Sequence, residues 1–309
     1  MIGASRRLLW APFVIAGVIL AAWYFVWRAG ADAMRDALAE FAAAQAQSGA
    51  AFTYEPMRAK GFPFFLRGEI GAVSLARGKW RWEAQAVYLH AAPWAPDRIV
   101  LSAGPAMRLA EPEGVWIIQA QGARASLEEA ESGWLFKAEA GSLDGAKEGE
   151  RVKTGRGVIN VMPDLKSAGA YAISFRLFEA TLKNPRGETK IARLDGSLSV
   201  APAARRIAIY GLDLDTGAAR ATLSGDLAMG AGGFLEGTLS ASLANPAALA
   251  ESLRVLGALK PEEARPVEAG LALIAAAGGG KIDAPLVFAD GETRLAGVKI
   301  GKAPKTGQP

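Results

Sequence analysis

The chain opens with a run of hydrophobic positions that no charged residue interrupts, from Leu8 to Trp27 (LLWAPFVIAGVILAAWYFVW). At about 1.5 Å per residue, a helix of this length crosses the ~30 Å hydrocarbon layer of a membrane. Arg6 and Arg7 precede the run, whereas the residues after it mix basic and acidic side chains. This bias favours a cytoplasmic N-terminus. The pattern therefore predicts a single-pass inner-membrane protein with most of the chain in the periplasm.

A cleaved signal peptide is the alternative for the same stretch. Signal peptides have a shorter apolar core of about 7–15 residues and small residues at the cleavage site. Here the far end reads Trp23-Tyr24-Phe25-Val26-Trp27. Bulky rings fit a signal protease poorly, but Trp and Tyr are favoured where a span meets water. We therefore expect residues 1–28 to form a cytoplasmic tip and an uncleaved anchor.

Residues 29–49 have helical periodicity. Met34, Leu38 and Phe41 recur at intervals of four and three and so share one helical face. Gly49 is typical of the position just after a helix end. The segment predicts a stem helix whose apolar face packs on the following domain, because about two heptads are too few to favour a coiled coil.

From residue 51 the hydrophobic period changes to two, which is typical of strands with one solvated face. In the run from Lys79 to His90, the apolar face is expected to carry Trp80, Trp82, Ala84, Ala86 and Tyr88. Similar runs lie at 99–103, 115–121, 134–140, 158–162, 171–182, 191–200, 207–215, 219–229 and 234–243. Turn-forming residues separate them. This order predicts an antiparallel β meander.

A short motif recurs in the meander, with two aliphatic residues and a glycine on one face and polar residues on the other. Its copies are Leu66-Arg67-Gly68-Glu69-Ile70, Leu194-Asp195-Gly196-Ser197-Leu198, Leu223-Ser224-Gly225-Asp226-Leu227 and Leu235-Glu236-Gly237-Thr238-Leu239. The glycine leaves a gap that permits tight curvature or the close approach of another group. A one-sided strand over a packed core and a ligand-lined concave face both fit this pattern.

The C-terminal region predicts two helices. Asn245-Pro246 supplies a cap and a first-turn proline for a helix whose buried face carries Leu249, Leu253 and Leu256. A loop at 260–266 leads to a second helix at 267–277, which the following glycines end.

A hairpin is expected after these helices, with strands at 282–288 and 292–300 around Asp290-Gly291. The tail at 302–309 is expected to be disordered.

Together these patterns predict a mainly β protein. An N-terminal transmembrane helix and a stem helix lead into a long curved antiparallel meander, which is either an open groove or barrel-like. A helix pair and a closing hairpin complete it. The expected boundaries are 1–28 for the tip and anchor, 29–49 for the stem helix, 50–301 for a periplasmic β-rich domain, and 302–309 for the tail.

Composition narrows the function classes. Three of the four net positive charges come from Arg6, Arg7 and Arg28, which leaves +1 for residues 29–309. That balance does not support nucleic-acid binding. The chain has no cysteine, which excludes disulfides and thiolate chemistry and is compatible with an oxidising periplasm.

Motifs for catalysis are missing, and the sequence holds one histidine. We interpret His90 as structural, because a zinc site takes several imidazole or thiolate ligands. Asp213 and Asp215 resemble the start of a calcium loop that lacks its third ligand position and terminal glutamate, so a solvated strand end is favoured. Residues 230–233 predict a hairpin turn, and the glutamates at 128–131 an exposed acidic turn. We expect no metal, no cofactor and no enzymatic activity, although a carboxylate dyad assembled from distant strands stays open.

Aromatic side chains supply the candidate apolar groove. In Gly61-Phe62-Pro63-Phe64 the two phenylalanines point the same way in an extended chain, and proline suits a strand start or edge. The candidate groove residues are Phe62, Phe64, Trp80, Trp82 and Trp116, with Leu194 and Leu198 ranked below them. The alternative is that all of these side chains fill a core.

These segments also carry a family resemblance. The anchor, Gly61-Phe62-Pro63-Phe64, Trp94-Ala95-Pro96-Asp97 and the closing hairpin with Val298-Lys299-Ile300-Gly301 resemble domain of unknown function family 2125, single-span proteins of Gram-negative bacteria. That resemblance implies no established activity. More distantly, the helix pair and hairpin are similar to the end of AsmA-like proteins, which would imply an anchored β-groove protein linked to lipid transport and outer-membrane homeostasis.

Two functions therefore stand as hypotheses. In the first, the tethered β sheet binds or helps to move lipid or another hydrophobic molecule in envelope homeostasis, without a cofactor. In the second, the protein is a non-catalytic structural or interaction module with a closed β core that binds an envelope protein partner. An open, apolar trough would favour the first hypothesis and a sealed sandwich the second.

Overall fold

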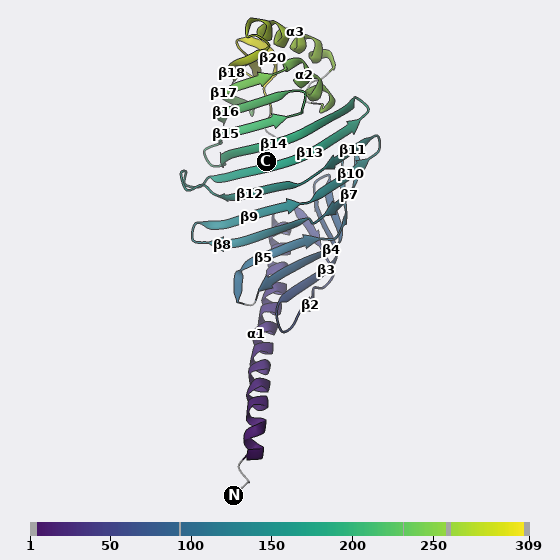
Figure 1. The fold of residues 1–309 in the computed structure, drawn as a ribbon, viewed down its shortest axis with the longest axis vertical. Coiled ribbons are helices and arrows are strands. Elements are labelled where there is room, and N and C mark those ends of the chain that lie inside the picture. The colour runs from purple at the N-terminus through teal and green to yellow at the C-terminus, as the bar shows by residue number, and fades with distance from the viewer. Residues whose placement is uncertain (1–4, 93, 231, 258–260, 306–309) are drawn as a thin grey trace. The chain divides into compact units, whose positions relative to one another are not determined.

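The computed structural model describes residues 5–92, 94–230, 232–257 and 261–305 and has a mainly β fold (Figure 1). The strand pairs recorded among these residues are all antiparallel, as the alternating pattern predicted. Contacts divide the chain into two compact units. The first comprises Met1–Trp116 with Arg124–Glu128, and the second Ile117–Ala123 with Glu129–Pro309.

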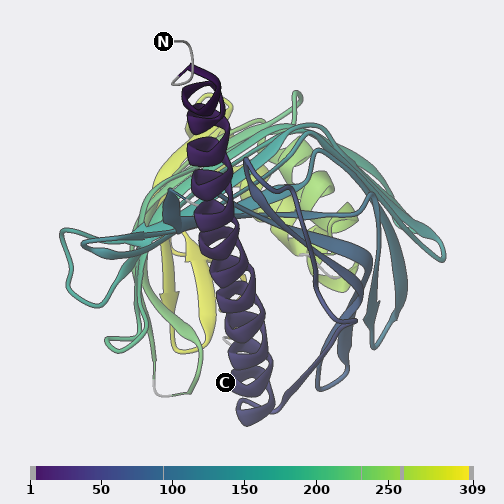
Figure 2. The ribbon, with the colours of Figure 1, turned by 90° about the horizontal axis from the view of Figure 1, so that it is seen from below.

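The first unit begins with α1 (Ser5–Gln47), which is one uninterrupted helix of 43 residues (Figure 2). Within the described residues, one helix is long and apolar enough to cross a membrane, and it is this one. The helix ends just before Gly49, which has a positive φ of 78°, so the predicted glycine stop is confirmed. A single apolar helix at this end is compatible with a single-pass anchor.

The C-terminal half of α1 packs on β1 (Ala50–Thr53) and β3 (Leu66–Arg77). Met34 is buried together with Leu66 and Ile70, and Leu38 packs against the same cluster. Phe41 meets Phe52 of β1 edge-on, with ring centroids 5.1 Å apart. The predicted packing of the stem face on the following domain is therefore confirmed.

β3 runs beside α1 and leads away from the apolar span. Its first residue, Leu66, lies next to Gly30 of the helix. Its last residue, Arg77, pairs with Ala50, which follows the helix end. β2 (Arg58–Lys60) pairs with the early part of β3, and β4 (Trp80–Ala92) pairs along its whole length. The far end of β3 therefore lies roughly 36 Å along the strand from its start.

The remaining strands of this region are β5 (Ala95–Ala103), β6 (Ala106–Glu111), β7 (Gly114–Gln121) and β8 (Arg124–Ala130). β4 pairs with β5 along its later residues and with β6 along its earlier ones. The expected acidic turn at 128–131 is wrong in its first part, because β8 continues through Ala130. Glu128 lies opposite Arg98 of β5, whose guanidinium is 3.8 Å from its carboxylate.

The second unit holds the longer part of the meander (Figure 1). From β12 onward each strand pairs with the next along the chain. β13 also pairs with β11, and β12 with β9. The strands are β9 (Gly133–Ala140), β10 (Ser142–Lys147), β11 (Glu150–Thr154), β12 (Gly157–Pro163), β13 (Tyr171–Asn184), β14 (Gly187–Ala201), β15 (Arg206–Asp215), β16 (Arg220–Met229), β17 (Leu235–Ala244), β18 (Lys281–Ala289), β19 (Glu292–Leu295) and β20 (Val298–Lys302).

Two helices cover part of this sheet. α2 (Pro246–Val255) starts as predicted, with the Asn245 side chain accepting from the Ala248 N–H. Leu249 and Leu253 pack in the core, but Leu256 is 37% exposed, because it lies at the helix end and Val255 fills the buried position. α3 (Pro261–Ala277) begins within the predicted 260–266 loop, since proline is favoured in the first helical turn. Residues 258–260 lie outside the described part of the chain.

The closing hairpin has three strands instead of the two that were predicted. The turn at Asp290-Gly291 is confirmed, with both residues at positive φ. The predicted strand at 292–300 is wrong, because Ala296-Gly297 forms a second turn between β19 and β20, again with both residues at positive φ.

The predicted disordered tail starts too early. Lys302 ends β20, Ala303 is buried, and Lys305 bridges to Phe234. Residues 306–309 lie outside the described part.

Candidate functional site

Two of the predicted aromatics lie in a loop against α1. The loop, residues 61–65, joins β2 to β3 and contains a cis Phe62–Pro63 peptide bond. The Phe62 ring meets Tyr24 and Trp27 of α1 edge-on, at centroid distances of 5.4 and 5.9 Å. The Phe64 side chain, by contrast, is 73% exposed. Phe62 thus packs against the helix, whereas Phe64 is mainly exposed to solvent.

The three predicted tryptophans have different surroundings. Trp82 packs against the core cluster between α1 and β3. Trp80 is half-exposed and lines a hollow of about 470 Å³ with Val115 and several charged side chains. Trp116 is partly buried, and its indole N–H donates to Glu111 at 2.8 Å.

The expectation of one apolar face along β4 is wrong, because the inward side changes partway along the strand. Trp82 packs in the core, but beyond it the core residues are Val87 and Leu89, whereas Tyr88 lies under the Arg67 guanidinium at 4.3 Å. On the neighbouring strand, Ala72 adopts a left-handed φ of 44° beside this change. The buried residues of β3 change side at the same place, from Leu66 and Ile70 to Val73, while the pairing of the two strands keeps one register.

The predicted aromatics therefore do not form one groove. The loop with Phe62 and Phe64 precedes the first residue of β3, and Trp80 pairs with the last one. The 12 residues of β3 separate them by roughly 36 Å.

A larger apolar surface lies on one face of the second unit. Side chains of directly paired residues in antiparallel strands point to the same side. One row of such pairs runs from Ala138 of β9 through Ile159, Phe175, Gly196, Leu212, Leu223 and Ala241 to Ala284 of β18. A parallel row contains Phe136, Val161, Ile173, Leu198 and Ile209. The opposite face is mainly polar.

Within the described residues of the second unit, helices cover only the C-terminal part of this face. Ala241 and Leu243 are buried beneath Leu249 of α2 and Val267 and Leu271 of α3. Among the described residues, the buried clusters include no side chain from β9, β12, β13 or β14. We call this part the uncovered apolar face; it consists of Phe136, Ala138, Ile159, Val161, Ile173, Phe175, Leu177, Leu194 and Leu198.

Two of these residues, Leu194 and Leu198, were among the lower-ranked candidates. Phe136 and Ile159 at its N-terminal end are 36% and 37% exposed. The other members were not predicted from the sequence, because the candidates were chosen from segments rich in aromatic residues and not from strands with a simple alternation of apolar and polar residues. The available signal was the period-two pattern of 158–162 and 171–177, which gives one apolar side once the two strands are paired.

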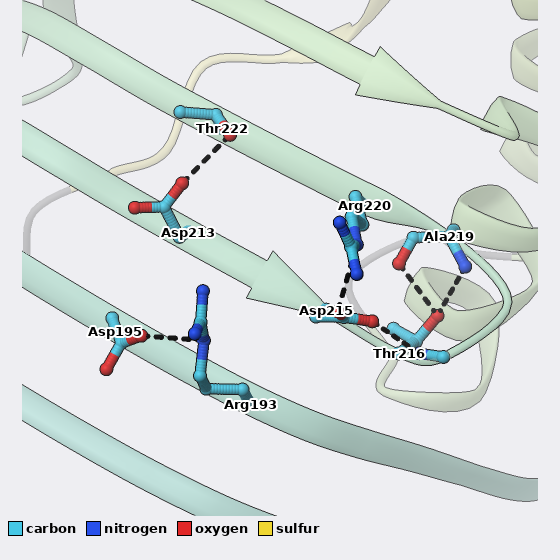
Figure 3. A network of polar contacts seen from close by, with 9 residues as sticks. Arg193, Asp195, Asp213, Asp215, Thr216, Ala219, Arg220 and Thr222 are labelled. Atoms are coloured by element: carbon cyan, nitrogen blue, oxygen red, sulfur yellow. Dashed lines mark hydrogen bonds and ion pairs between the residues drawn. The ribbon is translucent and has the colours of Figure 1, made fainter.

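The polar face of the same strands holds a hollow of about 620 Å³ lined by Arg156, Asn160, Ser174, Arg176, Asp195 and Asp213, among others. Its acidic groups already have protein partners (Figure 3). Asp195 accepts from Arg176 at 2.6 Å and from Arg193 at 2.8 Å. Asp213 accepts from the Thr222 hydroxyl at 2.9 Å.

The Asp215 turn is likewise internally satisfied (Figure 3). Its carboxylate accepts from the Gly217 N–H at 2.7 Å and from Arg220 at 2.9 Å. These donors, the backbone N–H first, hold the pKa of Asp215 below its ordinary value. Thr216 bonds Ala219 rather than pointing at a shared centre. This arrangement supports the interpretation of the segment as a strand end.

The histidine has an electrostatic environment that disfavours a bound cation. His90 on β4 is paired with Arg67 on β3. Partial burial, and then the positive charge of Arg67, lower the pKa of His90. Within the described residues, no three His, Asp or Glu side chains are grouped as a metal site would require.

Sequence comparison bears on the identity of the whole chain. The profile of a family described as "Uncharacterized protein conserved in bacteria (DUF2125)" matches residues 27–304. The match begins at the last residue of the apolar span and includes the 61–65 loop, the uncovered apolar face and the closing hairpin. No curated protein and no solved structure matches the chain, and the AsmA-like resemblance gains no support. Since the match covers most of its length, the chain belongs to the DUF2125 family, as its motifs predicted.

Proposed function

We propose that this protein binds lipid or another hydrophobic molecule on the uncovered apolar face, as a membrane-anchored component of the Gram-negative envelope. The observation that supports this most directly is the continuous apolar side of β9 and β12–β18, of which α2 and α3 cover only one part. Soluble proteins rarely leave a contiguous apolar patch open unless something binds there.

The energetics of the proposed site need no catalyst or cofactor. Each methylene that moves from water onto an apolar surface gains about 0.8 kcal/mol, before the cost of ordering the ligand. Four neighbouring strands at about 4.8 Å spacing give a face roughly 14 Å across, which is wide enough for an acyl chain. We therefore propose binding or transfer of a hydrophobic molecule, with no enzymatic activity.

The proposed location follows from the first 28 residues. The uncharged run crosses the inner membrane, Arg6 and Arg7 keep the N-terminus in the cytoplasm, and the β units lie in the periplasm. This orientation would place the apolar face between the two membranes.

Site-specific photocrosslinking in cells tests the proposal. A photoreactive amino acid at Ile159, on the uncovered face, should give adducts with the mass of a lipid, detected by mass spectrometry of the purified chain. The matched control is Leu165, an aliphatic residue that is 87% exposed but lies on a turn outside that face. Lipid adducts at Ile159 but not at Leu165 support the proposal. Equal labelling, or none at Ile159, contradicts it.

A non-catalytic interaction module remains the second candidate. It is favoured by the C-terminal part of the face, where α2, α3 and the sheet enclose a core that includes Ile282 and Leu295. If the uncovered part is closed by a partner protein instead, the Ile159 adduct will have the mass of a protein. The same experiment thus separates the two functions.

A further inference from the structure

The 61–65 loop is unusually apolar for an exposed connection. It reads Gly-Phe-Pro-Phe-Phe, without a polar side chain. Phe64 and Phe65 are 73% and 50% exposed. A cluster of exposed aromatic side chains on one short loop indicates contact with another apolar phase rather than with water.

The loop is fixed to α1 by directional contacts. The Trp23 indole N–H donates to the Pro63 carbonyl at 2.5 Å, and the Trp27 indole N–H donates to the Phe65 carbonyl at 2.9 Å. Phe62 packs on the rings between these two bonds. The loop's position along the helix axis is therefore set by residues 23–27.

This position coincides with the end of the apolar run. Trp27 is its last residue and Arg28 the first charged one after it. Trp23 lies four residues earlier, about 6 Å deeper along the axis. Helical side chains lean toward the N-terminus of the helix, so the atoms that contact the loop lie at least as deep as their own backbone. A helix that spans a bilayer with residues 8–27 would hold the loop at the boundary of the hydrocarbon layer.

Basic residues stand just outside the loop. β2, which leads into it, carries Arg58 and Lys60, both exposed, and Lys60 is also paired with Glu69 at 2.7 Å. Apolar side chains with cationic neighbours at their rim match the order of acyl chains and phosphates at a bilayer surface.

We infer that the 61–65 loop is a second membrane contact, which inserts Phe64 and Phe65 into the leaflet that faces the β units. The occupant of this apolar surface is phospholipid, because the surface is continuous with the anchor helix. This inference depends on α1 spanning the membrane, but not on ligand binding at the uncovered apolar face.

Because the chain has no cysteine, single-cysteine variants of the full-length protein can report the depth of the loop. Phe64→Cys carries a polarity-sensitive fluorophore in vesicles of phosphatidylethanolamine and phosphatidylglycerol, with and without lipid that bears a shallow nitroxide quencher. Trp80→Cys is the matched control, since Trp80 is an exposed aromatic of the same unit at the far end of β3. Phe25→Cys, within the apolar run, is the positive control.

We expect nitroxide lipid to quench the probe at residue 64 at least about twofold more than the probe at residue 80, with a blue-shifted emission. Phe65→Cys should behave like Phe64→Cys, which provides a second reading if one substitution impairs folding. If Phe25→Cys is quenched but the loop probes differ less than twofold from Trp80→Cys, the inference is wrong. If Phe25→Cys itself is not quenched, the anchor fails together with the loop contact, whatever the outcome at Ile159.

Discussion

At the scale of single residues, the recurring glycine motif has a clear physical meaning. A Cβ on Gly68 would meet the sulfurs of Met57 and Met34, at 2.5 and 2.9 Å, so this glycine allows α1 to approach the sheet. At Gly196 the gap is filled by the Phe175 ring from the neighbouring strand. The sequence indicated close approach of another group, and in these two copies the group belongs to the protein itself.

Other copies of the motif contain a backbone constraint. Gly237 has a φ of 141°, and an added Cβ would overlap the carbonyl oxygen of Asp226. We expect Gly237→Ala to lower the free energy of unfolding by about 1–3 kcal/mol, measured by thermal or denaturant unfolding of the solubilised protein. Gly211→Ala is the control, because a Cβ there has nothing within 4 Å, and it should change stability by less than about 0.5 kcal/mol. Equal losses for the two variants would contradict this explanation.

Asp164 joins the loop after β12 to two neighbouring strands. Its carboxylate accepts from the Ser199 hydroxyl at 2.5 Å, from the Lys166 N–H at 2.9 Å and from the Tyr210 hydroxyl at 3.5 Å. These bonds, the one from Ser199 first, lower the pKa of Asp164 from its ordinary value. The ionised carboxylate is thus stabilised in the folded state.

This shift gives a direction for the pH dependence of stability. A carboxyl with a depressed folded-state pKa contributes fully above its unfolded pKa, and the contribution is lost as pH falls through the folded pKa. We expect the melting temperature to fall on acidification below the ordinary aspartate range, and to fall less in Asp164→Asn. Ser199→Ala should also flatten the profile, since it removes the strongest donor. An Asp164→Asn profile parallel to the wild type would exclude this role.

At the scale of elements, the long strands could be predicted and the short ones could not. Each predicted run from 79 to 243 corresponds to a strand, with ends shifted by a few residues. The missed strands β6, β8, β10 and β11 have five to seven residues. So few residues offer only two or three inward positions, which is too little for a period to stand out.

Turn chemistry explains the other error at this scale. Asp290-Gly291 has the residues that a tight hairpin turn prefers, but Ala296-Gly297 adopts the same conformation without a favoured first residue. Ala296 is held at a φ of 50°, in the left-handed region that alanine disfavours. The turn at Ala296-Gly297 therefore could not be predicted from turn-forming residues in the sequence.

The same strain allows a stabilising substitution. Ala296→Asn should raise the free energy of unfolding by about 1 kcal/mol, because asparagine tolerates the left-handed conformation better than alanine does. Its N–H bond to the Pro285 carbonyl, 3.1 Å long, is unaffected. Differential scanning calorimetry should show a higher melting temperature for this variant. Ala289→Asn, on the adjoining strand, should not raise the melting temperature. A lower melting temperature for Ala296→Asn would contradict the proposed strain.

The candidate site depended on information that the sequence does not carry. Tyr88 left the predicted face because the inward side of β4 changes beyond Ala84, and the alternation within one strand does not show that change. Conversely, Phe136 and Ile159 became neighbours of a shared face through strand register, which periodicity within one strand does not specify. The sequence identifies the aromatic residues that are candidates for a groove. It does not show that the fold places them in separate parts of the first unit.

At the scale of the whole chain, fold class and family were predictable because they depend on its strongest patterns. An uncharged run of 20 residues and a succession of alternating strands need no tertiary information. The division into two compact units, by contrast, has no marker such as a linker rich in proline or glycine.

Topology across the membrane is the prediction that belongs to this scale. In cells with a permeabilised outer membrane, an impermeant maleimide should label Trp80→Cys, whereas Ser5→Cys should react only after the inner membrane is broken. In the proposed orientation, Arg6 and Arg7 are retained in the cytoplasm. The cysteine-free wild type gives the background. The reverse labelling pattern would overturn the proposed orientation.

Finally, the continuity of α1 has a mechanical consequence. The helix has no break between the apolar run and the residues that pack on β3, so no flexible joint separates the first unit from the segment that could anchor it in a membrane. Helices adjust their tilt to the thickness of the surrounding bilayer. If α1 spans the membrane, a thinner or thicker bilayer would change the tilt of the helix and of the first unit together. The lipid composition around the helix would then affect the orientation of the strands of this unit.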